Sequence, residues 1–210
     1  MKTIVLASAS PRRREILKNL GLSFEVLSAD VDESSAERDP ARLSELLAAR
    51  KGDAAAEILR AAGRDLSDLL VIASDTVVAV DVPCRNSADG GDTVKILGKP
   101  RDADDARRML SLLSGRAHRV VSGIYLYLNG KRAVSHDVTE VVFDTLSPEE
   151  IDRYIASGEP FGKAGAYAIQ GHAATFVSGI RGDYFNVVGL PVHRMCALFG
   201  AAFPKEPPLV

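Results

Sequence analysis

The sequence has only two cysteines among its 210 residues and four histidines. Cys84 and Cys196 lie far apart and belong to no CxxC pair, so the sequence indicates neither a disulfide framework nor a zinc site. The histidines lack the spacing of metal ligands, and we interpret them as surface or hairpin residues.

The sequence also has no excess of positive charge. Its 26 lysines and arginines stand against 28 aspartates and glutamates, which gives a formal net charge of −2. Proteins that grip long nucleic acids carry a basic surface, so we expect no nucleic-acid polymer as a partner. A small anionic ligand is still compatible with this balance, because local charge can oppose net charge.

No apolar run is long enough to cross a membrane. The longest, residues 69–80, is interrupted by Ser74, Asp75 and Thr76. The apolar run Ile4–Ala7 is shorter than the roughly 7 to 15 residues of a signal peptide. We therefore expect a soluble, cytoplasmic protein with no membrane partner, and the sequence leaves a homodimer open.

Internal repeats and linkers rich in Pro, Gly or Ser are absent, and the hydrophobic and charged fractions of 46% and 26% are those of a folded domain. Strand-like and helix-like segments alternate, which predicts one α/β domain over residues 1–203 with a mixed, twisted sheet and flanking helices. Residues 204–210 are expected to form a flexible tail. We predict strands over 3–7, 24–27, 69–73, 77–82, 94–97, 118–128 and 132–143, and helices over 11–20, 40–62, 102–113, 147–158 and from 191 onward.

Several of these elements have specific signals. Asn129-Gly130 is the strongest short hairpin signal in the chain, and residues 147–150 form a capping box. Gly21 is expected to stop the first helix. The helix over 40–62 is expected to bury a stripe made of Leu43, Leu46, Leu47, Ile58 and Leu59.

The phosphate-binding and catalytic motifs GxxxxGK[ST], GxGxxG, GxSxG and HExxH are all absent. The first candidate site is the strand-to-helix turn that contains Ser8, Ser10, Arg12 and Arg13. Free backbone N–H groups at a helix start, two hydroxyls and two arginines suit a phosphate group. An N-capped helix with solvated arginines explains the same residues equally well.

Asp75 is the second candidate, because it interrupts an apolar run. A carboxylate in such a place must be paired, hydrogen-bonded or functional. It suits a general base or a metal ligand at the end of a strand. An aspartate bonded to turn amides is the alternative.

A third set consists of Lys51, Lys99, Lys163 and Gln170. Small neighbours around Lys163 would let a ligand approach the backbone, and the amide of Gln170 suits the edge of a nucleobase. Solvated surface lysines and a glutamine bonded to backbone are the alternatives.

Together these segments resemble the Maf family of nucleotide pyrophosphatases. The pieces that carry the resemblance follow in order along nearly the whole chain: LASASPRR, ASDTVV, GKPRD, RMLSLLSGRAH, SGEPFGKAGAYAIQG and GDYFNVVGLP. The resemblance implies a fold similar to the inosine triphosphatase type, with two lobes around a nucleotide cleft. It also implies cleavage of a nucleoside triphosphate to monophosphate and pyrophosphate, with Mg²⁺ or Mn²⁺ as cofactor.

The resemblance also implies roles for single residues. Asp75 matches the proton acceptor, Glu33 an acidic residue near the metal and the attacking water, and both would be metal ligands. Lys163 joins them as a catalytic residue. The residues implied to bind substrate are Ser8, Arg12, Arg13, Lys51, Thr76, Lys99 and Gln170, together with Lys163.

The form KAGAYxIQG resembles the branch of the family that prefers dTTP and UTP. A glutamine amide could pair with the O4 and N3–H edge of uracil or thymine. Two alternatives stay open: a related branch acts on 7-methyl-GTP and has Glu in place of this Gln, and a nucleotide-binding regulator of septum formation would show no significant turnover.

Two features depart from the family pattern. The segment 84–94 is longer than the tight hairpin usual there, and its role is open. Gly52 stands where alanine is common, and glycine inside a helix costs about 1 kcal/mol relative to alanine. We therefore expect a weaker helix at this point.

Overall fold

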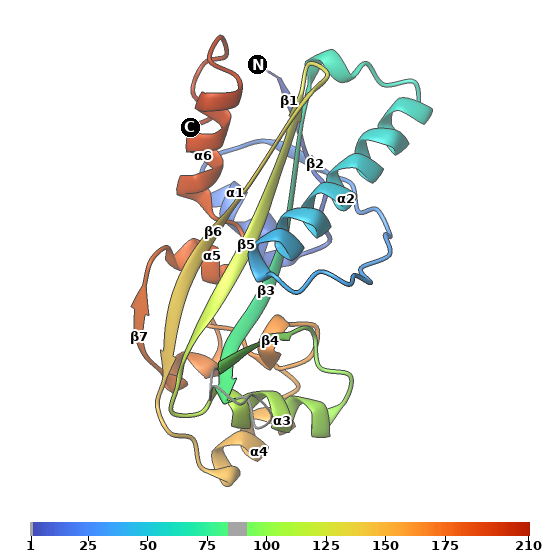
Figure 1. Cartoon of the computed structure of the whole chain (residues 1–210). Helices are drawn as coiled ribbons and strands as arrows, with labels where there is room; N and C mark the ends of the chain where they lie inside the picture. Colours follow the sequence, from blue (N-terminus) through green and yellow to red (C-terminus); the bar gives the residue numbers. More distant parts are fainter. Residues whose placement is uncertain (1, 84–91) are drawn as a thin grey trace. The chain divides into compact units, whose positions relative to one another are not determined.

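The computed structural model describes residues 2–83 and 92–210, so Cys84 and most of the long segment 84–94 lie outside the described residues. The elements in chain order (Figure 1) are β1 Thr3–Leu6, α1 Pro11–Asn19, β2 Phe24–Val26, α2 Pro40–Ala61, η1 Leu66–Asp68, β3 Leu69–Pro83, β4 Asp92–Leu97, α3 Ala103–Leu113, β5 Ala117–Leu128, β6 Lys131–Phe143, α4 Pro148–Ala156, η2 Ala164–Ala166, η3 His172–Phe176, β7 Val177–Arg181, α5 Tyr184–Val188 and α6 Val192–Ala202.

Within that part of the chain the strands form one seven-stranded sheet in the order β2-β1-β3-β5-β6-β7, with β4 also paired to β3. β1 runs parallel to both β2 and β3, and Ile4 lies opposite Leu70. The pairs β3–β4 and β6–β7 are antiparallel. The predicted α/β fold with a mixed sheet and flanking helices is therefore confirmed.

The chain forms two compact units. Unit 1 consists of Met1–Thr76, Ser122–Asp137 and Phe185–Val210, and unit 2 of Val77–Val121 and Val138–Tyr184. The expected boundary between a domain and a flexible tail at residue 203 stays a prediction. None of the helices in the described ranges is long and apolar enough to cross a membrane.

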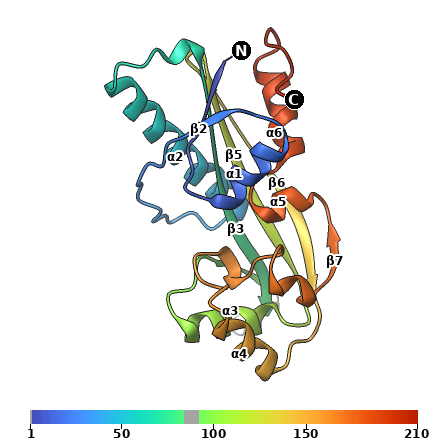
Figure 2. The same cartoon turned by 180° about the vertical axis from the view of Figure 1, so that it is seen from behind.

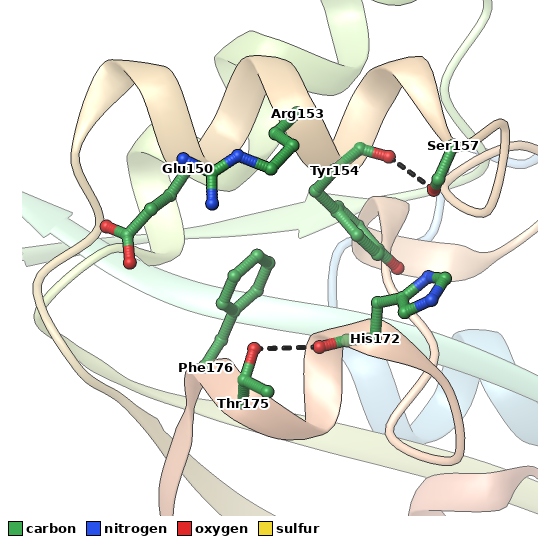
Figure 3. Close-up of a pocket in the computed structure, with 7 residues that line it drawn as sticks. All are labelled: Glu150, Arg153, Tyr154, Ser157, His172, Thr175 and Phe176. Carbon is green, nitrogen blue, oxygen red and sulfur yellow. Dashed lines mark hydrogen bonds between the residues drawn. The ribbon is translucent and has the colours of Figure 1, made fainter.

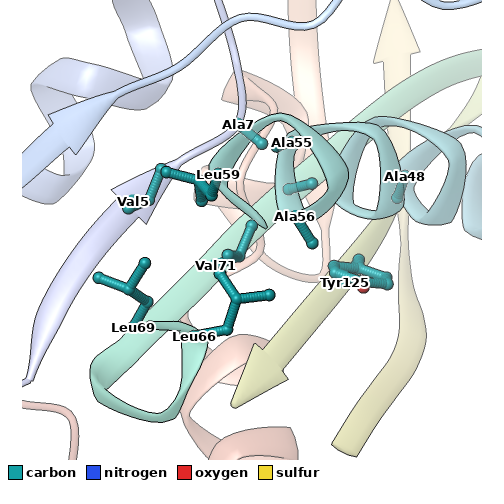
Figure 4. Close-up of a cluster of buried hydrophobic side chains, with 11 residues drawn as sticks. Val5, Ala7, Ala48, Ala55, Ala56, Leu59, Leu66, Leu69, Val71 and Tyr125 are labelled. Atoms are coloured by element: carbon teal, nitrogen blue, oxygen red, sulfur yellow. The ribbon is translucent and has the colours of Figure 1, made fainter. Parts of the chain in front are cut away.

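In unit 1, α2 lies on one face of the sheet, and α1 and α6 lie on the other (Figures 1 and 2). Alternate residues of a strand point to the same face, and in this way Val5 of β1 and Leu69, Val71 and Ala73 of β3 share a cluster with residues of α2. The cluster on this face (Figure 4) contains Val5, Ala7, Ala48, Ala55, Ala56, Leu59, Leu66, Leu69, Val71, Ala73 and Tyr125.

The buried stripe of α2 differs from the predicted one. Leu47 and Leu59 are buried, but Leu46 and Ile58 are exposed. Small residues, above all Ala48 and the pair at 55–56, occupy the centre of the packed face. Alanines bring the helix close to the sheet, so the stripe is centred on them and two of the larger side chains turn outward.

Gly52 has a packing role in α2, which is unbroken at this residue. A Cβ atom at Gly52 would lie 2.1 Å from Cδ1 of Tyr125, so only glycine leaves room for that ring. The Tyr125 hydroxyl donates to Oδ1 of Asp53 at 2.7 Å, and Arg132 binds Oδ2 at 2.9 Å. Burial and the hydrogen bond to Asp53 raise the pKa of Tyr125.

In unit 2, α3 packs against α4 and η2. The capping box at the start of α4 is confirmed, with Ser147 and Glu150 each bonded to the backbone of the other. His118 is buried in an aromatic cluster, where its Nε2 lies 2.9 Å from Oη of Tyr167 and its ring contacts Phe143 edge-on. Burial lowers the pKa of His118 to about 4.

Candidate functional site

The turn between β1 and α1 is organised by Ser8. Ser8 is buried, and its Oγ accepts a hydrogen bond from the backbone N–H of Ser10 at 3.2 Å. α1 begins at Pro11, as predicted, with Ser10 in the N-cap position. The Ser10 side chain makes no capping hydrogen bond, so its hydroxyl is not used by the helix start.

Arg13 lies inside unit 1 and is held by three protein groups. Its Nε donates to the carbonyl of Gly189 at 2.7 Å, Nη1 to Ser8 Oγ at 3.1 Å and Nη2 to Thr76 Oγ1 at 3.1 Å. Burial lowers the pKa of Arg13, while the charges of Asp75 and Glu33 act to raise it. The alternative of a solvated arginine is therefore wrong for Arg13.

The chain around residue 189 anchors both arginines. Arg12 Nε lies 3.4 Å from the carbonyl of Val188, and burial lowers the pKa of Arg12. Gly189 has a φ of +121° and approaches Thr76 so closely that a Cβ would lie 3.3 Å from Oγ1. Glycine suits both the backbone angle and the close approach.

Three polar residues behind this network were not assigned roles from the sequence. Ser74 Oγ donates to the Gly189 carbonyl at 3.0 Å, and Ser122 Oγ lies 2.8 Å from Thr76 Oγ1. Ser122 also donates through N and Oγ to the side chain and backbone of Asn186. Asn186 is completely buried. The only signal in the sequence was its position inside the segment GDYFNVVGLP.

Asp75 lies within β3 and is paired with Lys51 of α2. The ammonium of Lys51 donates to Oδ1 of Asp75, and it also lies 2.7 Å from Oε1 of Glu33. The side chains of Lys51 and Asp75 are only 15% and 12% exposed. Neither the solvated-lysine alternative nor the aspartate bonded to turn amides fits these contacts.

The position of Asp75 corrects one expectation. Two separate strands were predicted over 69–73 and 77–82, with Asp75 at a strand end, but β3 is continuous from Leu69 to Pro83. The polar residues Ser74, Asp75 and Thr76 predict a break between two strands. The structure satisfies them inside the strand, through Lys51 for Asp75 and through Gly189 for Ser74.

The two carboxylates of Asp75 and Glu33 fit a hard divalent cation. They converge on one positive group, the ammonium of Lys51. Among the residues that the structure describes, no group of three or more His, Cys, Asp or Glu side chains could hold a metal. Mg²⁺ commonly binds through one or two carboxylates, with substrate phosphates and waters completing its shell.

The other predicted residues belong to unit 2. The Gly98 carbonyl accepts from the Gly165 N–H at 3.0 Å, so the segments that carry Lys99 and Lys163 are joined. Lys163 Nζ donates to the Glu159 carbonyl at 2.5 Å. Gln170 is exposed in the turn that precedes η3.

The segment after Lys163 has an unusual backbone. Gly165 and Ala166 have φ angles of +69° and +62°. A Cβ at Gly165 would lie 2.9 Å from a methyl group of Val78. Glycine at position 165 therefore suits both the packing against β3 and the backbone conformation, and the close approach of a ligand beside Lys163 stays a prediction.

Unit 2 also has a surface pocket of about 360 Å³ between α4 and η3 (Figure 3). Its lining, as far as the described residues show it, includes none of the residues with an expected role. The pocket is lined by Glu150, Arg153, Tyr154, Ser157, His172, Thr175 and Phe176.

Residues 3–202 match the family described as Maf-like protein. Among curated relatives, a dTTP/UTP pyrophosphatase of Chromobacterium violaceum is 48% identical and covers 98% of this chain and 96% of its own length. A dTTP/UTP pyrophosphatase of Desulforamulus reducens is 47% identical, with coverages of 93% and 94%. One of Bacillus cereus is 41% identical, and both coverages are 93%.

A solved structure from Mycobacterium abscessus, titled as a nucleoside-triphosphatase and dITP/XTP pyrophosphatase, aligns over 97% of this chain and 95% of its own. Its TM-score is 0.41 at 20% identity, which is too low to support an argument. The family match and the identities to the curated relatives are sufficient by themselves: the chain belongs to the Maf family.

Proposed function

We propose that this protein hydrolyses nucleoside triphosphates between the α and β phosphates, releasing the monophosphate and pyrophosphate, with dTTP and UTP as preferred substrates. The name shared by relatives that are 41–48% identical supports the substrate class. The observation that carries the proposal is the arrangement of charge in unit 1. Lys51 holds two carboxylates beside the network of Ser8, Arg13 and Thr76.

In the proposed reaction Asp75 acts as the general base. Its carboxylate takes a proton from water as the water oxygen attacks the α phosphorus in line. The bond from that phosphorus to the bridging oxygen breaks, and pyrophosphate leaves with the electron pair. Proton transfer of this kind contributes about 10²- to 10⁴-fold to the rate.

Ser8, Arg12 and Arg13 are proposed to bind phosphate oxygens at the start of α1, where backbone N–H groups also favour an anion. A guanidinium carries five N–H groups on its three nitrogen atoms. Each nitrogen of Arg13 donates a hydrogen bond to a protein group, and these bonds fix the orientation of the side chain. Donors that are oriented in advance stabilise transition-state charge without reorganisation.

The cofactor we propose is Mg²⁺ or Mn²⁺, held by Asp75 and Glu33. When bound, such a cation would neutralise charge on the phosphate oxygens. Lys51 is bonded to both carboxylates, so it orients them as a pair.

For the residues of unit 2 the proposal rests on the family resemblance. Lys99 and Lys163 would contribute positive charge to the phosphates, with Lys163 acting in catalysis, and Gln170 would read the base edge. The near balance of charged residues supports a small nucleotide rather than a nucleic-acid polymer as the partner. We also propose a cytoplasmic location, where nucleoside triphosphates are made and used.

Pyrophosphate release from a panel of canonical and modified nucleotides, with Mg²⁺ or Mn²⁺, tests this proposal. We expect the highest kcat/KM for dTTP and UTP. Activity on none of the panel would overturn the proposal, and tight UTP binding without pyrophosphate release would favour a regulator. A preference for 7-methyl-GTP would contradict the pyrimidine assignment.

A further inference from the structure

Glu159 is a carboxylate in unit 2 to which the proposed reaction gives no role. It lies between α4 and η2, and its side chain is only 17% exposed. Oε1 accepts from the Tyr154 hydroxyl at 2.9 Å, and Oε2 accepts from the backbone N–H of His172 at 3.0 Å. The His172 ring lies 3.1 Å from the same oxygen.

These contacts reach both sides of Gln170. Before Gln170, the Ala168 N–H donates to the Tyr154 hydroxyl at 3.2 Å, and that hydroxyl is bonded to Glu159. After Gln170, the N–H of His172 binds Glu159 directly. Figure 3 shows Tyr154 on α4 facing His172 on η3. The turn that carries Gln170 is therefore held on either side by one carboxylate.

Gly171 lies directly against the carboxylate of Glu159. A Cβ at Gly171 would lie 2.3 Å from both oxygens of Glu159, although its φ of −109° is one that other residues adopt. The glycine is thus required by the position of Glu159 and not by the backbone angle. The backbone carbonyl of Glu159 also accepts from Lys163 Nζ at 2.5 Å, so the beginning of the segment is tied to the same residue.

The hydrogen bonds favour the ionised carboxylate. Burial acts to raise the pKa of Glu159, but the backbone N–H groups of His172 and Ala173 and the Tyr154 hydroxyl outweigh it and hold that pKa below its usual range. An ionised carboxylate can accept all of these bonds at once, whereas an amide of the same shape offers one oxygen.

We propose that Glu159 is a positioning residue for base recognition, which fixes the turn of Gln170 through Tyr154 on one side and the backbone of η3 on the other. This inference rests on the proposed function, because it assumes that Gln170 reads the pyrimidine edge. Glu159 itself touches no substrate. Its loss therefore weakens selection of the base more than it slows the chemical step.

The test compares UTP with CTP, which differ at the edge that a glutamine amide would read. For Glu159→Ala we expect KM for UTP to rise about tenfold and the preference for UTP over CTP to fall about tenfold, the range of one well-placed base contact. We expect kcat to change less than about threefold, as when uniform binding is lost. Glu159→Gln, which keeps one acceptor oxygen, is expected to lose about threefold in preference.

Gly171→Ala gives an independent route to the same effect. This variant keeps Glu159 but displaces its carboxylate, so it should reproduce the loss of preference for UTP over CTP. Tyr154→Phe should reproduce that loss in part. Glu149→Gln, an exposed glutamate in the first turn of α4, is the matched control and should behave as wild type. Melting temperatures and hydrogen exchange at the amides of Ala168 and His172 separate misplacement from unfolding.

Binding of UTP and CTP is measured alongside turnover, so that the two proposals fail separately. A wild-type protein that prefers UTP in binding but releases no pyrophosphate would overturn the proposed function only. Folded Glu159→Gln and Gly171→Ala proteins with wild-type preference for UTP would overturn the positioning role only. A loss of kcat with KM and preference unchanged would also overturn it.

Discussion

At the scale of single residues, Asp75 and Glu33 differ from ordinary surface carboxylates. Both are bound by the same ammonium group, that of Lys51. The Asp75 side chain is only 12% exposed, whereas the Glu33 side chain is 44% exposed. In the proposed reaction the buried carboxylate of Asp75 suits proton transfer, and the more exposed carboxylate of Glu33 suits its proposed place near the metal and the attacking water.

Asp75→Asn keeps the shape of the side chain and removes the proposed base. We expect kcat to fall at least about 100-fold, the lower range for general base catalysis, with a smaller change in KM. Steady-state pyrophosphate release measures the effect, and calorimetry with Mn²⁺ checks the metal. Turnover near the wild-type value with intact metal binding would show that Asp75 is not the base.

The sequence singled out most of the polar side chains that the structure brings together in unit 1, but it did not indicate their partners. A carboxylate in an apolar run had to be paired, yet nothing local indicated that Lys51, 24 residues earlier, would pair with it. Arg13 contacts the carbonyl of Gly189, which is 176 residues away. Asn186 was missed because a lone asparagine carries no local signal. Its place in the network follows from the hydrogen bonds that it accepts from Ser122.

At the scale of elements, two helices begin with the same Ser-Pro pair but differ in how the serine is used. Ser147 forms a complete capping box, whereas the Ser10 side chain makes no capping bond. Ser147→Ala is therefore expected to lower the free energy of unfolding by about 1 kcal/mol, and Ser10→Ala by much less. Urea unfolding of both variants measures the difference, and equal losses would contradict it.

Gly52 in α2 offers a second comparison. Gly52→Ala would force a methyl group into the Tyr125 ring, and overpacking of this kind costs about 1–3 kcal/mol, which outweighs a gain of about 1 kcal/mol in helix propensity. Gly200 in α6 has nothing within 4 Å of its added Cβ. We expect Gly52→Ala to lower the melting temperature and Gly200→Ala to raise it slightly. A more stable Gly52→Ala protein would contradict the packing role.

Elements with strong local chemistry were predicted correctly, and those determined by distant contacts were not. The Asn129-Gly130 hairpin has φ angles of +51° and +76° at its two turn residues, as a tight turn of this type requires. The prediction of the buried stripe of α2 was wrong at Leu46 and Ile58, and the predicted break in β3 was also wrong. Both depend on what packs against the element, which periodicity does not report.

At the scale of the whole molecule, His118 links the folded state to pH. Burial holds its pKa at about 4, below the 6.5 of an unfolded chain, so unfolding takes up a proton between these values. This contribution to stability is fully present above pH 6.5 and is lost as the pH falls through about 4. We expect the free energy of unfolding to drop by about 2 kcal/mol from pH 7 to pH 5.

The variant His118→Gln tests the source of that loss. It removes the titrating group and keeps a polar side chain that can bond to Tyr167. Denaturant unfolding at pH 7 and pH 5 should show a smaller drop in stability than in the wild type. An equal drop in both proteins would assign the pH dependence to other groups.

The fold class and the family segments could be predicted over nearly the whole chain, because their signals recur in order from residue 6 to residue 191. The division into two units was expected from the family resemblance, which implies two lobes, and not from local patterns, since β3, β5 and β6 each contribute residues to both units. A strand that serves two units has the same alternation as any other strand.

The products formed from UTP test the central claim most directly. Phosphorus NMR of UTP incubated with the protein and Mg²⁺ or Mn²⁺ should show UMP and pyrophosphate as the initial products, because the proposed attack at the α phosphorus expels pyrophosphate. The Asp75→Asn protein should form them at least about 100-fold more slowly. UDP and inorganic phosphate, or no turnover of any nucleotide, would contradict the account.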